Sequence, residues 1–359
     1  MIFFRFGLPL SVAFLGILVG QGWNIRFVSV QTSNGVNNQR ESIINALLIT
    51  KAINGTFLLP RVYPIWLRDA VGNSAGSLKW NSASYVTPWT GMITSGLKSY
   101  PFGYLFDVET LSTTVRSVQI SVTSKLPPRN IKKINFRFYY KRYWYTGLRD
   151  LISKKAILSR LPSHVLLNFP SLLGLFRPTR PEHLHSKRFP GFGHVWYCNR
   201  TVLCGKLCAG LKGNKAISHQ VDKILKYLRS DFTAVHWRMF QCKDYEIRAR
   251  KLEEYLVQNL PYRSIIYLVS AISKVIFRTL SKHFTVVTKN DVTPGIDSLY
   301  PFSALALIDY EVSLKASKFF GMELLTSRTF HASTFSSFVV QMRFMRGMPS
   351  QQLPEDTFC

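Results

Sequence analysis

The chain has 359 residues, of which 46 are Lys or Arg and 19 are Asp or Glu, so its net charge at neutral pH is +27. Hydrophobic residues make up 47% of the chain and charged residues 18%, which excludes an intrinsically disordered protein. The length suffices for about two domains. The positive charge indicates anionic partners: nucleotide phosphates, acidic glycans, nucleic acid or a membrane surface.

The first residues predict entry into the secretory pathway. Residues 6–20, which follow Arg5, are uncharged and almost entirely apolar. This run is short for a bilayer span, which needs about 20 residues, but it fits a secretory signal peptide or a short signal anchor. We therefore assign residues 1–22 to such a segment, with a buried first strand or helix of a soluble domain as the alternative. The predicted location is the lumen of the Golgi or endoplasmic reticulum, either free or as a single-pass type II membrane protein.

Two further features agree with a luminal location. Asn54 and Asn199 each begin an Asn-x-Thr tripeptide, the acceptor pattern for N-glycosylation. In an oxidising lumen, the five cysteines predict one or two disulfides with one thiol left over, and the pairs stay open. Zinc is the alternative because His194 lies near three of them, but their spacing does not match a zinc motif. The cysteines are Cys198, Cys204, Cys208, Cys242 and Cys359.

The first part of the chain predicts the opening of a doubly wound sheet. A strand over residues 24–31, a polar turn to Arg40, a helix over 41–53 and a strand over 56–60 form a β-loop-α-β unit. Residues 61–104 are rich in Pro, Gly, Ser and Trp, and we interpret them as loops. Residues 104–111 look like a strand edge entering a helix. Asp107 and Glu109 lie there, but two acids are too few for a metal site.

A basic and aromatic segment follows. Residues 125–160 hold eleven Lys or Arg residues and a single acid, Asp150, with aromatic residues interleaved. Such a composition suits single-stranded nucleic acid. The N-terminal segment argues instead for a basic face whose aromatic rings pack inside, so we predict no nucleic-acid partner. Residues 160–215 are rich in Pro, Gly, Arg and His and look like the crossing between two halves, which we place at 23–200 and 201–359.

The second half alternates helices and strands, which predicts a second parallel sheet. The predicted helices span residues 217–228, 243–260, 272–283, 303–318 and 333–346, and the predicted strands span 232–235, 264–270, 284–288 and 318–321.

The end of the predicted strand 232–235 is a candidate anion site. His236 and Arg238 follow it, two residues apart, and such residues point to the same side of an extended chain. Ligands of open α/β sheets bind beyond the carboxyl ends of the strands. The planar fork of an arginine gives a phosphate two parallel hydrogen bonds. The alternative is a histidine satisfied in the core beside a surface arginine.

Three other segments carry chemistry of the same kind. The turn from Gly35 to Arg40 leads into a helix N-terminus, which offers backbone N–H groups to an anion, and Asn38 there can bond a sugar or phosphate oxygen. Asp309 lies in an apolar helix and needs a partner or water. The hydroxyls at residues 333–337 open a helix in a way that suits a phosphate, and Phe335 can stack on a base. Ordinary helix capping is the alternative for both helix starts.

In their order and spacing, these segments resemble the GDP-fucose-dependent protein O-fucosyltransferase superfamily, including its large plant branch. The resemblance rests on residues 37–60, 106–109, 234–238, 308–321 and 333–335. It implies an α/β fold of the GT-B type: two Rossmann-like, doubly wound halves with the donor in the cleft between them. The chain departs from the family pattern at Trp237, where a smaller apolar residue is usual, and at Lys318, where the family has Asp.

The resemblance also implies an activity. The expected reaction is an inverting, metal-independent transfer of fucose from GDP-fucose to a Ser or Thr hydroxyl of a protein, with no cofactor besides the donor substrate. A fucosyltransferase acting on a glycan and an inactive luminal glycan-binding protein are the alternatives. Arg238 is the expected catalytic residue, since it would stabilise the charge that develops on the leaving diphosphate. The expected donor-binding residues are Asn38, His236, Arg238, Asp309, Ser333, Thr334 and Phe335.

Overall fold

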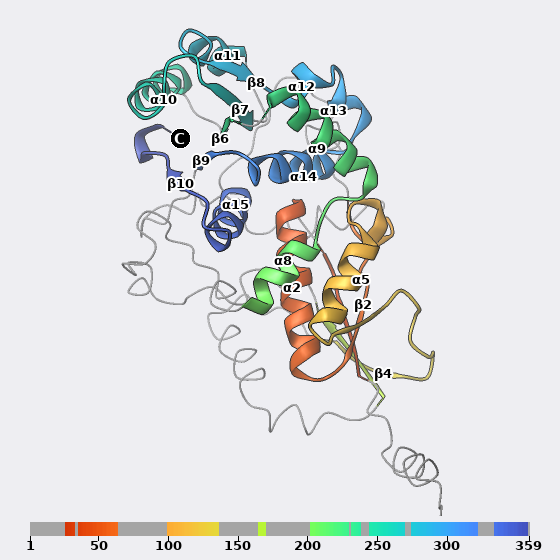
Figure 1. Ribbon diagram of the computed structural model, residues 1–359. Helices are drawn as coiled ribbons and strands as arrows, with labels where there is room; N and C mark the ends of the chain where they lie inside the picture. Colours follow the sequence, from red (N-terminus) through yellow and green to blue (C-terminus); the bar gives the residue numbers. More distant parts are fainter. Residues whose placement is uncertain are drawn as a thin grey trace, which may run out of the picture.

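The computed structural model describes residues 26–32, 35–63, 99–135, 164–169, 202–229, 231–237, 244–269, 274–321 and 334–357. Their strands form two five-stranded sheets, one from each half of the chain. Every strand pair in both sheets is parallel. Figure 1 shows the two sheets in separate lobes, with helices α14 and α15 of the upper lobe facing α2 and α8 of the lower one. The predicted pair of parallel sheets is therefore confirmed.

The first sheet has the strand order β3-β2-β1-β5-β4. Its strands are β1 (Arg26–Val30), β2 (Thr56–Leu58), β3 (Ser121–Thr123), β4 (Lys132–Asn135) and β5 (Val165–Phe169). The sequence predicted only the first two. The sequence of β4, Lys-Lys-Ile-Asn, is polar because the strand lies at the sheet edge. The apolar β5 pairs with β1 at the sheet centre, but it is short and lies in a segment rich in Pro and Gly.

Helix α2 (Val36–Ala52) connects β1 to β2. The prediction of a polar turn up to Arg40 is wrong, because the helix begins five residues before Glu41. Gly35 occupies the N-cap position, and the polar residues after it lie in the first helical turn. Asn37, Gln39 and Arg40 are all buried. They are buried because α2 packs against α8, α14 and α15 as well as its own sheet, so polarity there does not indicate a turn.

Three further helices pack in the described part of the first lobe. The short 3₁₀ helix η2 (Phe102–Tyr104) precedes α5 (Val108–Ser117), and α8 (Val202–Gly210) packs against α5 and α2. Asp107 is the N-cap of α5: one carboxylate oxygen accepts a 2.9 Å hydrogen bond from the backbone N–H of Thr110. The helix predicted after residue 104 is thus confirmed, and Asp107 is a capping residue.

The second sheet has the order β10-β9-β6-β7-β8. Its strands are β6 (Thr233–His236), β7 (Ile265–Val269), β8 (Thr285–Val287), β9 (Lys318–Gly321) and β10 (Ser350–Gln352). The four predicted strands are confirmed within a few residues. The sequence missed β10, which is short and polar and lies at the edge beside β9.

Seven α-helices and a final 3₁₀ helix accompany these strands in the described part of the second half. They are α9 (Lys215–Leu228), α10 (Tyr245–Asn259), α11 (Lys274–Leu280), α12 (Lys289–Val292), α13 (Ile296–Leu299), α14 (Phe302–Ser313), α15 (Thr334–Met345) and η5 (Glu355–Thr357). The predicted helix over 303–318 ends five residues early. The backbone N–H of Ser317 instead donates to the carbonyl of Phe232, which leads the chain into β9.

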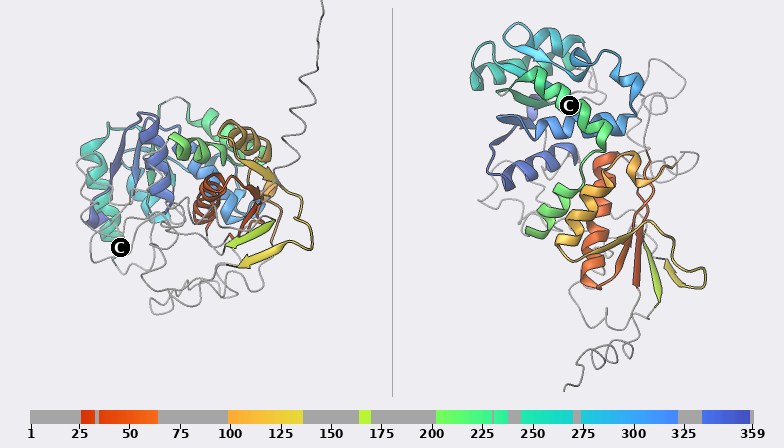
Figure 2. Two further views of the ribbon diagram at one scale, coloured as in Figure 1. Left: turned by 90° about the horizontal axis from the view of Figure 1, so that it is seen from below. Right: turned by 45° about the vertical axis from the view of Figure 1, so that its right-hand side comes forward.

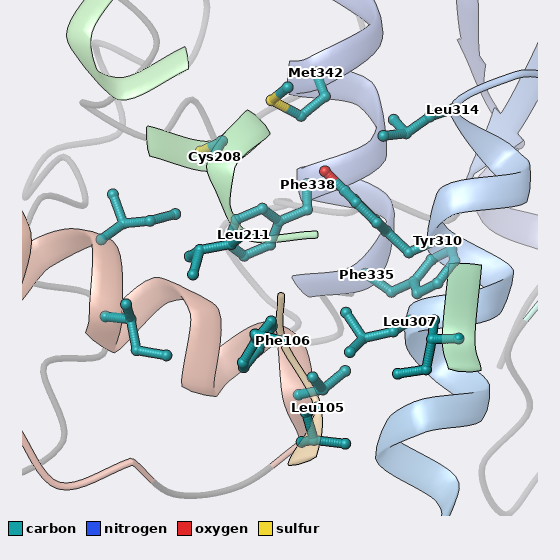
Figure 3. Close-up of a cluster of buried hydrophobic side chains, with 14 of the residues drawn as sticks. Leu105, Phe106, Cys208, Leu211, Leu307, Tyr310, Leu314, Phe335, Phe338 and Met342 are labelled. Atoms are coloured by element: carbon teal, nitrogen blue, oxygen red, sulfur yellow. The ribbon is translucent and has the colours of Figure 1, made fainter. Parts of the chain in front are cut away.

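One apolar cluster joins the two halves. It contains core residues of both sheets, such as Val28 of β1 and Ala234 of β6. Figure 3 shows its middle, where Phe106 and Leu211 of the first lobe approach Tyr310, Phe335 and Phe338 of α14 and α15. The same arrangement of two lobes around these helices is visible in the turned views (Figure 2). Outside residues 1–25 and the other undescribed segments, no helix is long and apolar enough to cross a membrane.

Candidate functional site

The candidate site is built around His236, the last residue of β6. Its Nδ1 lies 2.7 Å from the hydroxyl oxygen of Ser336 in α15. Its imidazole also packs against the ring of Phe335, with 4.5 Å between ring centroids and 34° between ring planes. The His236 side chain is buried at the carboxyl end of β6, the central strand of the second sheet. Ligands of open parallel sheets bind at this edge.

Residue Gly321 allows α15 to approach this edge closely. A Cβ atom at Gly321 would lie 2.6 Å from a ring carbon of Phe319 and 3.0 Å from the hydroxyl of Ser336. Only glycine fits there without moving the partner of His236. The glycine that ends β9 therefore permits the close approach of Ser336 in the first turn of α15, the end of a helix at which backbone N–H groups and the helix dipole favour an anion.

The structure describes only part of the predicted set at this edge. Arg238 and Ser333 lie outside the described residues, as does the side chain of Thr334, the first residue of α15. His236 and Phe335 are brought into direct contact. Their predicted roles toward a donor remain predictions.

Asn38 reaches the interface from the other half of the chain. It is half-buried in the first turn of α2, and its Oδ1 atom has no hydrogen-bond partner. Gly35, the N-cap residue of this helix, has no side chain with which to cap it. The neighbouring Gln39 amide is instead fixed, because it donates to the carbonyl of Tyr63 at 2.9 Å and accepts from the N–H of Tyr63 at 3.1 Å. The oxygen of Asn38 is thus buried without a partner on a helix that packs against α14 and α15, and its contact with a sugar or phosphate remains a prediction.

Asp309 of α14 has two partners in the structure. The Tyr267 hydroxyl donates to its Oδ1 at 2.6 Å, and the Lys289 ammonium donates to its Oδ2 at 2.8 Å. Burial, followed by the charge of Asp309, raises the pKa of Tyr267 well above its ordinary value. Each carboxylate oxygen has a second lone pair, so the group can still accept from a base. The requirement for a partner, inferred from the sequence, is met from within the protein.

Sequence reasoning missed three residues of this region. Ser336, Tyr267 and Lys289 contact predicted residues, but each lies in a different element. Lys289 offered a signal, since it directly follows the predicted strand 284–288 and therefore lies at the same sheet edge as His236. Ser336 lies within the predicted hydroxyl run of residues 333–337. Tyr267 offered no signal, because a tyrosine in a buried strand is normally interpreted as a core residue.

Trp237 faces away from the candidate site. Its side chain is fully buried in a second apolar cluster with Leu252, Phe320 and Leu353, on the side of β6 opposite His236. Consecutive strand residues point to opposite faces of a sheet, so a large residue at this position leaves the site unobstructed. The large side chain of Trp237, at a position where the family that the sequence resembles usually has a smaller apolar residue, thus packs in this second apolar cluster.

The cysteines show both states that the sequence predicted. Cys204 is disulfide-bonded, and Cys208, one turn later on α8, is a free buried thiol. Burial raises the pKa of the Cys208 thiol to about 12. Within the described ranges, no three His, Cys, Asp or Glu side chains are grouped as metal ligands would be.

Comparison with known proteins gives a likeness of structure. No protein-family model matches the chain, and no curated protein sequence matches it either. POFUT1 in complex with GDP-fucose superposes with a TM-score of 0.53 at 14% identity, over 92% of this chain and 98% of that one. POFUT1 in complex with GDP gives a TM-score of 0.52 at 13% identity over the same shares. The NodZ α-1,6-fucosyltransferase co-crystallised with GDP gives 0.49 at 13% identity, over 88% and 92%.

The two POFUT1 comparisons establish the fold. They extend over nearly the whole of both chains, so both sheets and their relative placement are shared. The chain therefore has the α/β, GT-B-like architecture that its sequence predicted, with two parallel five-stranded sheets.

Proposed function

We propose that this protein is a glycosyltransferase that transfers fucose from GDP-fucose to a Ser or Thr hydroxyl of a protein. The observation that carries the proposal is the cluster of His236, Phe335 and Ser336 at the carboxyl edge of β6. In a fold shared with POFUT1 bound to GDP-fucose, this edge faces the other half of the molecule. A helix N-terminus, an imidazole and an aromatic ring converge there, which suits a nucleoside diphosphate.

Each group has a task in the proposed reaction. The leaving GDP gains negative charge as the bond to fucose breaks, and Arg238, two residues beyond His236, would neutralise that charge. Backbone N–H groups at the start of α15, with Ser333 and Thr334, would hold the phosphates, and Phe335 would stack on the base. Asp309 would accept from the guanine, and Asn38 would contact the sugar or phosphate. The acceptor hydroxyl attacks the anomeric carbon from the face opposite GDP and releases its proton to solvent as the bond to GDP breaks, so the anomeric centre is inverted. The proposed step uses no metal.

The proposed setting is the lumen of the secretory pathway, reached through residues 1–22. The described part of the chain offers one supporting observation. Asn54, which begins a glycosylation tripeptide, is exposed in the turn between α2 and β2. To test this location, the protein is expressed in secretory cells and treated with peptide N-glycosidase, which should increase its electrophoretic mobility. Asn54→Gln and Asn199→Gln are the controls. Absence of N-glycans from the expressed protein, including at Asn54, would contradict the proposed location.

Calorimetry with GDP and GDP-fucose tests the activity. We expect both to bind the purified protein, and a screen of nucleotide sugars to select GDP-fucose. Arg238→Ala should abolish transfer while the urea unfolding curve stays unchanged. Absence of GDP binding by the folded protein would refute the proposal. Transfer to free oligosaccharides but not to protein hydroxyls would favour a glycan acceptor, and donor binding without transfer to either would favour an inactive binding protein.

A further inference from the structure

Arg40 is a buried arginine where the two halves of the molecule meet. It lies on α2, is 1% exposed, and packs on rings from the other half. Its guanidinium carbon is 3.9 Å from the ring centroid of Tyr310 in α14 and 5.1 Å from that of Phe338 in α15. Both distances are within the range of a cation–π contact. The charge of Arg40 therefore lies among aromatic rings of the second half.

The hydrogen bonds of Arg40 are few for a buried arginine. Among the described residues, one of its nitrogens has a hydrogen-bond partner: Nη2 donates to the carbonyl of Cys208 at 3.3 Å, while Nε and Nη1 have none there. Arg343 of α15, which is fully buried too, provides the comparison. All three of its nitrogens donate to acceptors at 2.6–3.2 Å, most of them backbone carbonyls around the end of α14 and the turn before β10. Arg343 is a structural arginine, whereas Arg40 is left with unused donors.

Arg40 also lacks a counter-charge. Within the described part of the chain, no carboxylate forms an ion pair with it. Its ionisable neighbours are the Cys208 thiol and the Tyr310 phenol. Burial raises the pKa of both groups, that of Cys208 to about 12, so both are uncharged at neutral pH. A buried charge without a partner is costly, so its retention in a native structure calls for an explanation.

The rings around Arg40 lead directly to the candidate site. Tyr310 contacts Phe335 edge-on, with ring centroids 6.4 Å apart and planes at 89°. Phe335 in turn packs against His236. Two aromatic rings, those of Tyr310 and Phe335, therefore lie between the charge of Arg40 and His236 at the edge of β6. In such a medium of low dielectric constant, a charge acts over a longer distance than in solvent.

We propose that the diphosphate of the nucleotide donor supplies the missing counter-charge, so that Arg40 is a positioning residue that strengthens diphosphate binding without contacting it. This inference rests on the proposed function and adds a second, buried source of positive charge to Arg238. It accounts for the unpaired donors, since full pairing with a carboxylate would cancel the field at the site. It also accounts for the position of Arg40 on α2. The electric field of this residue in the first half would strengthen donor binding at the edge of β6 in the second half.

The test compares a charged ligand with its neutral counterpart. GDP and guanosine share the base and the ribose, and only GDP carries the diphosphate. The charge of Arg40 should therefore affect the affinity for GDP and not the affinity for guanosine. Calorimetry should show that Arg40→Met weakens GDP binding about tenfold and leaves guanosine binding unchanged; tenfold corresponds to about 1.4 kcal/mol. Arg40→Lys, which keeps the charge, should recover most of the GDP affinity. The effect should persist at 0.5 M salt, because a buried charge is poorly screened.

Two controls separate this role from a structural one. Arg116→Met removes the same formal charge from an exposed position on α5 and should leave GDP affinity unchanged. Ligand-free Arg40→Met should be as resistant to urea as the wild type, or more so, because an uncompensated buried charge is removed. Equal losses of GDP and guanosine affinity, an unchanged GDP affinity, or failure of Arg40→Met to fold would each overturn the inference. Failure of the wild type to bind GDP would instead refute the proposed function, and this inference with it.

Discussion

The indole N–H of Trp237 donates a 2.7 Å hydrogen bond to the backbone carbonyl of Thr357, 120 residues later in the chain. The bond ties the C-terminal segment to the residue beside His236. Nearby, the ammonium of Lys251 on α10 contacts the carboxylate of Asp356 at 3.0 Å, and the Arg248 guanidinium donates to the Asp356 carbonyl. Residues 356 and 357 thus hold the strand end that carries the candidate site from the face opposite His236.

Trp237→Phe should destabilise the protein by about 1–3 kcal/mol, because the buried carbonyl of Thr357 loses its donor and the smaller ring leaves space in the buried cluster. Urea unfolding measures the change. The matched control is a chain ending at Leu353, in which the carbonyl is absent and Trp237→Phe should cost much less. Equal costs in the full-length and shortened chains would show that the hydrogen bond contributes nothing.

Ser336→Ala should weaken GDP binding about five- to tenfold, because Nδ1 of His236 loses a buried partner and the imidazole loses its fixed orientation. Thr50 of α2 is the control: its hydroxyl is also buried, but it donates within its own helix, to the carbonyl of Ala46 at 2.7 Å. Thr50→Ala should leave GDP affinity close to that of the wild type. Calorimetry measures the GDP affinity of both variants, and circular dichroism confirms that they fold. Similar affinities for the two variants would count against a role for Ser336.

The ion pair between Lys289 and Asp309 should be costly to break from one side. Both side chains are largely buried, so Lys289→Met leaves a buried carboxylate with only the Tyr267 hydroxyl as donor. We expect a loss of about 3–5 kcal/mol in the free energy of unfolding. The double variant Lys289→Met with Asp309→Leu should lose less than the single variant, since no charge remains unpaired. A double variant that is less stable than the single one would contradict this account.

Stability should fall in alkaline solution as the buried acids ionise. Burial raises the pKa of the Cys208 thiol from its ordinary 9.0 to about 12 in the folded protein. Between these values the unfolded chain has lost this proton while the folded protein keeps it. The unfolded state then binds fewer protons, so the free energy of unfolding decreases as the pH rises above about 9.

Urea unfolding at a series of pH values from 7 to 10.5 measures this effect. Cys208→Ala should show a shallower decline than the wild type above pH 9, although the cavity it leaves lowers stability at every pH. The raised pKa of Tyr267 and Tyr310 should leave some decline in both proteins. Identical slopes would show that Cys208 does not titrate across the transition.

The sequence located most elements of the second half because their patterns are local. The apolar strands β6 and β7 and the amphipathic helix α9 can each be recognised without knowledge of their neighbours. The strands β4 and β10 were missed because an edge strand can be polar and short. The start of α2 was misplaced because burial of Asn37 and Arg40 depends on α8, α14 and α15, which come much later in the chain.

The sequence by itself determined the class of fold, which follows from local periodicity. From the order of its motifs it also predicted site residues on strand ends and helix starts, and their roles remain predictions. Only the tertiary structure decided which residues meet. It brought Ser336 to His236, Lys289 and Tyr267 to Asp309, and Arg40 to Tyr310. Such pairs join different elements, and no local pattern encodes their distance. For the same reason Trp237, conspicuous in sequence beside His236, proved to belong to the opposite face of the strand.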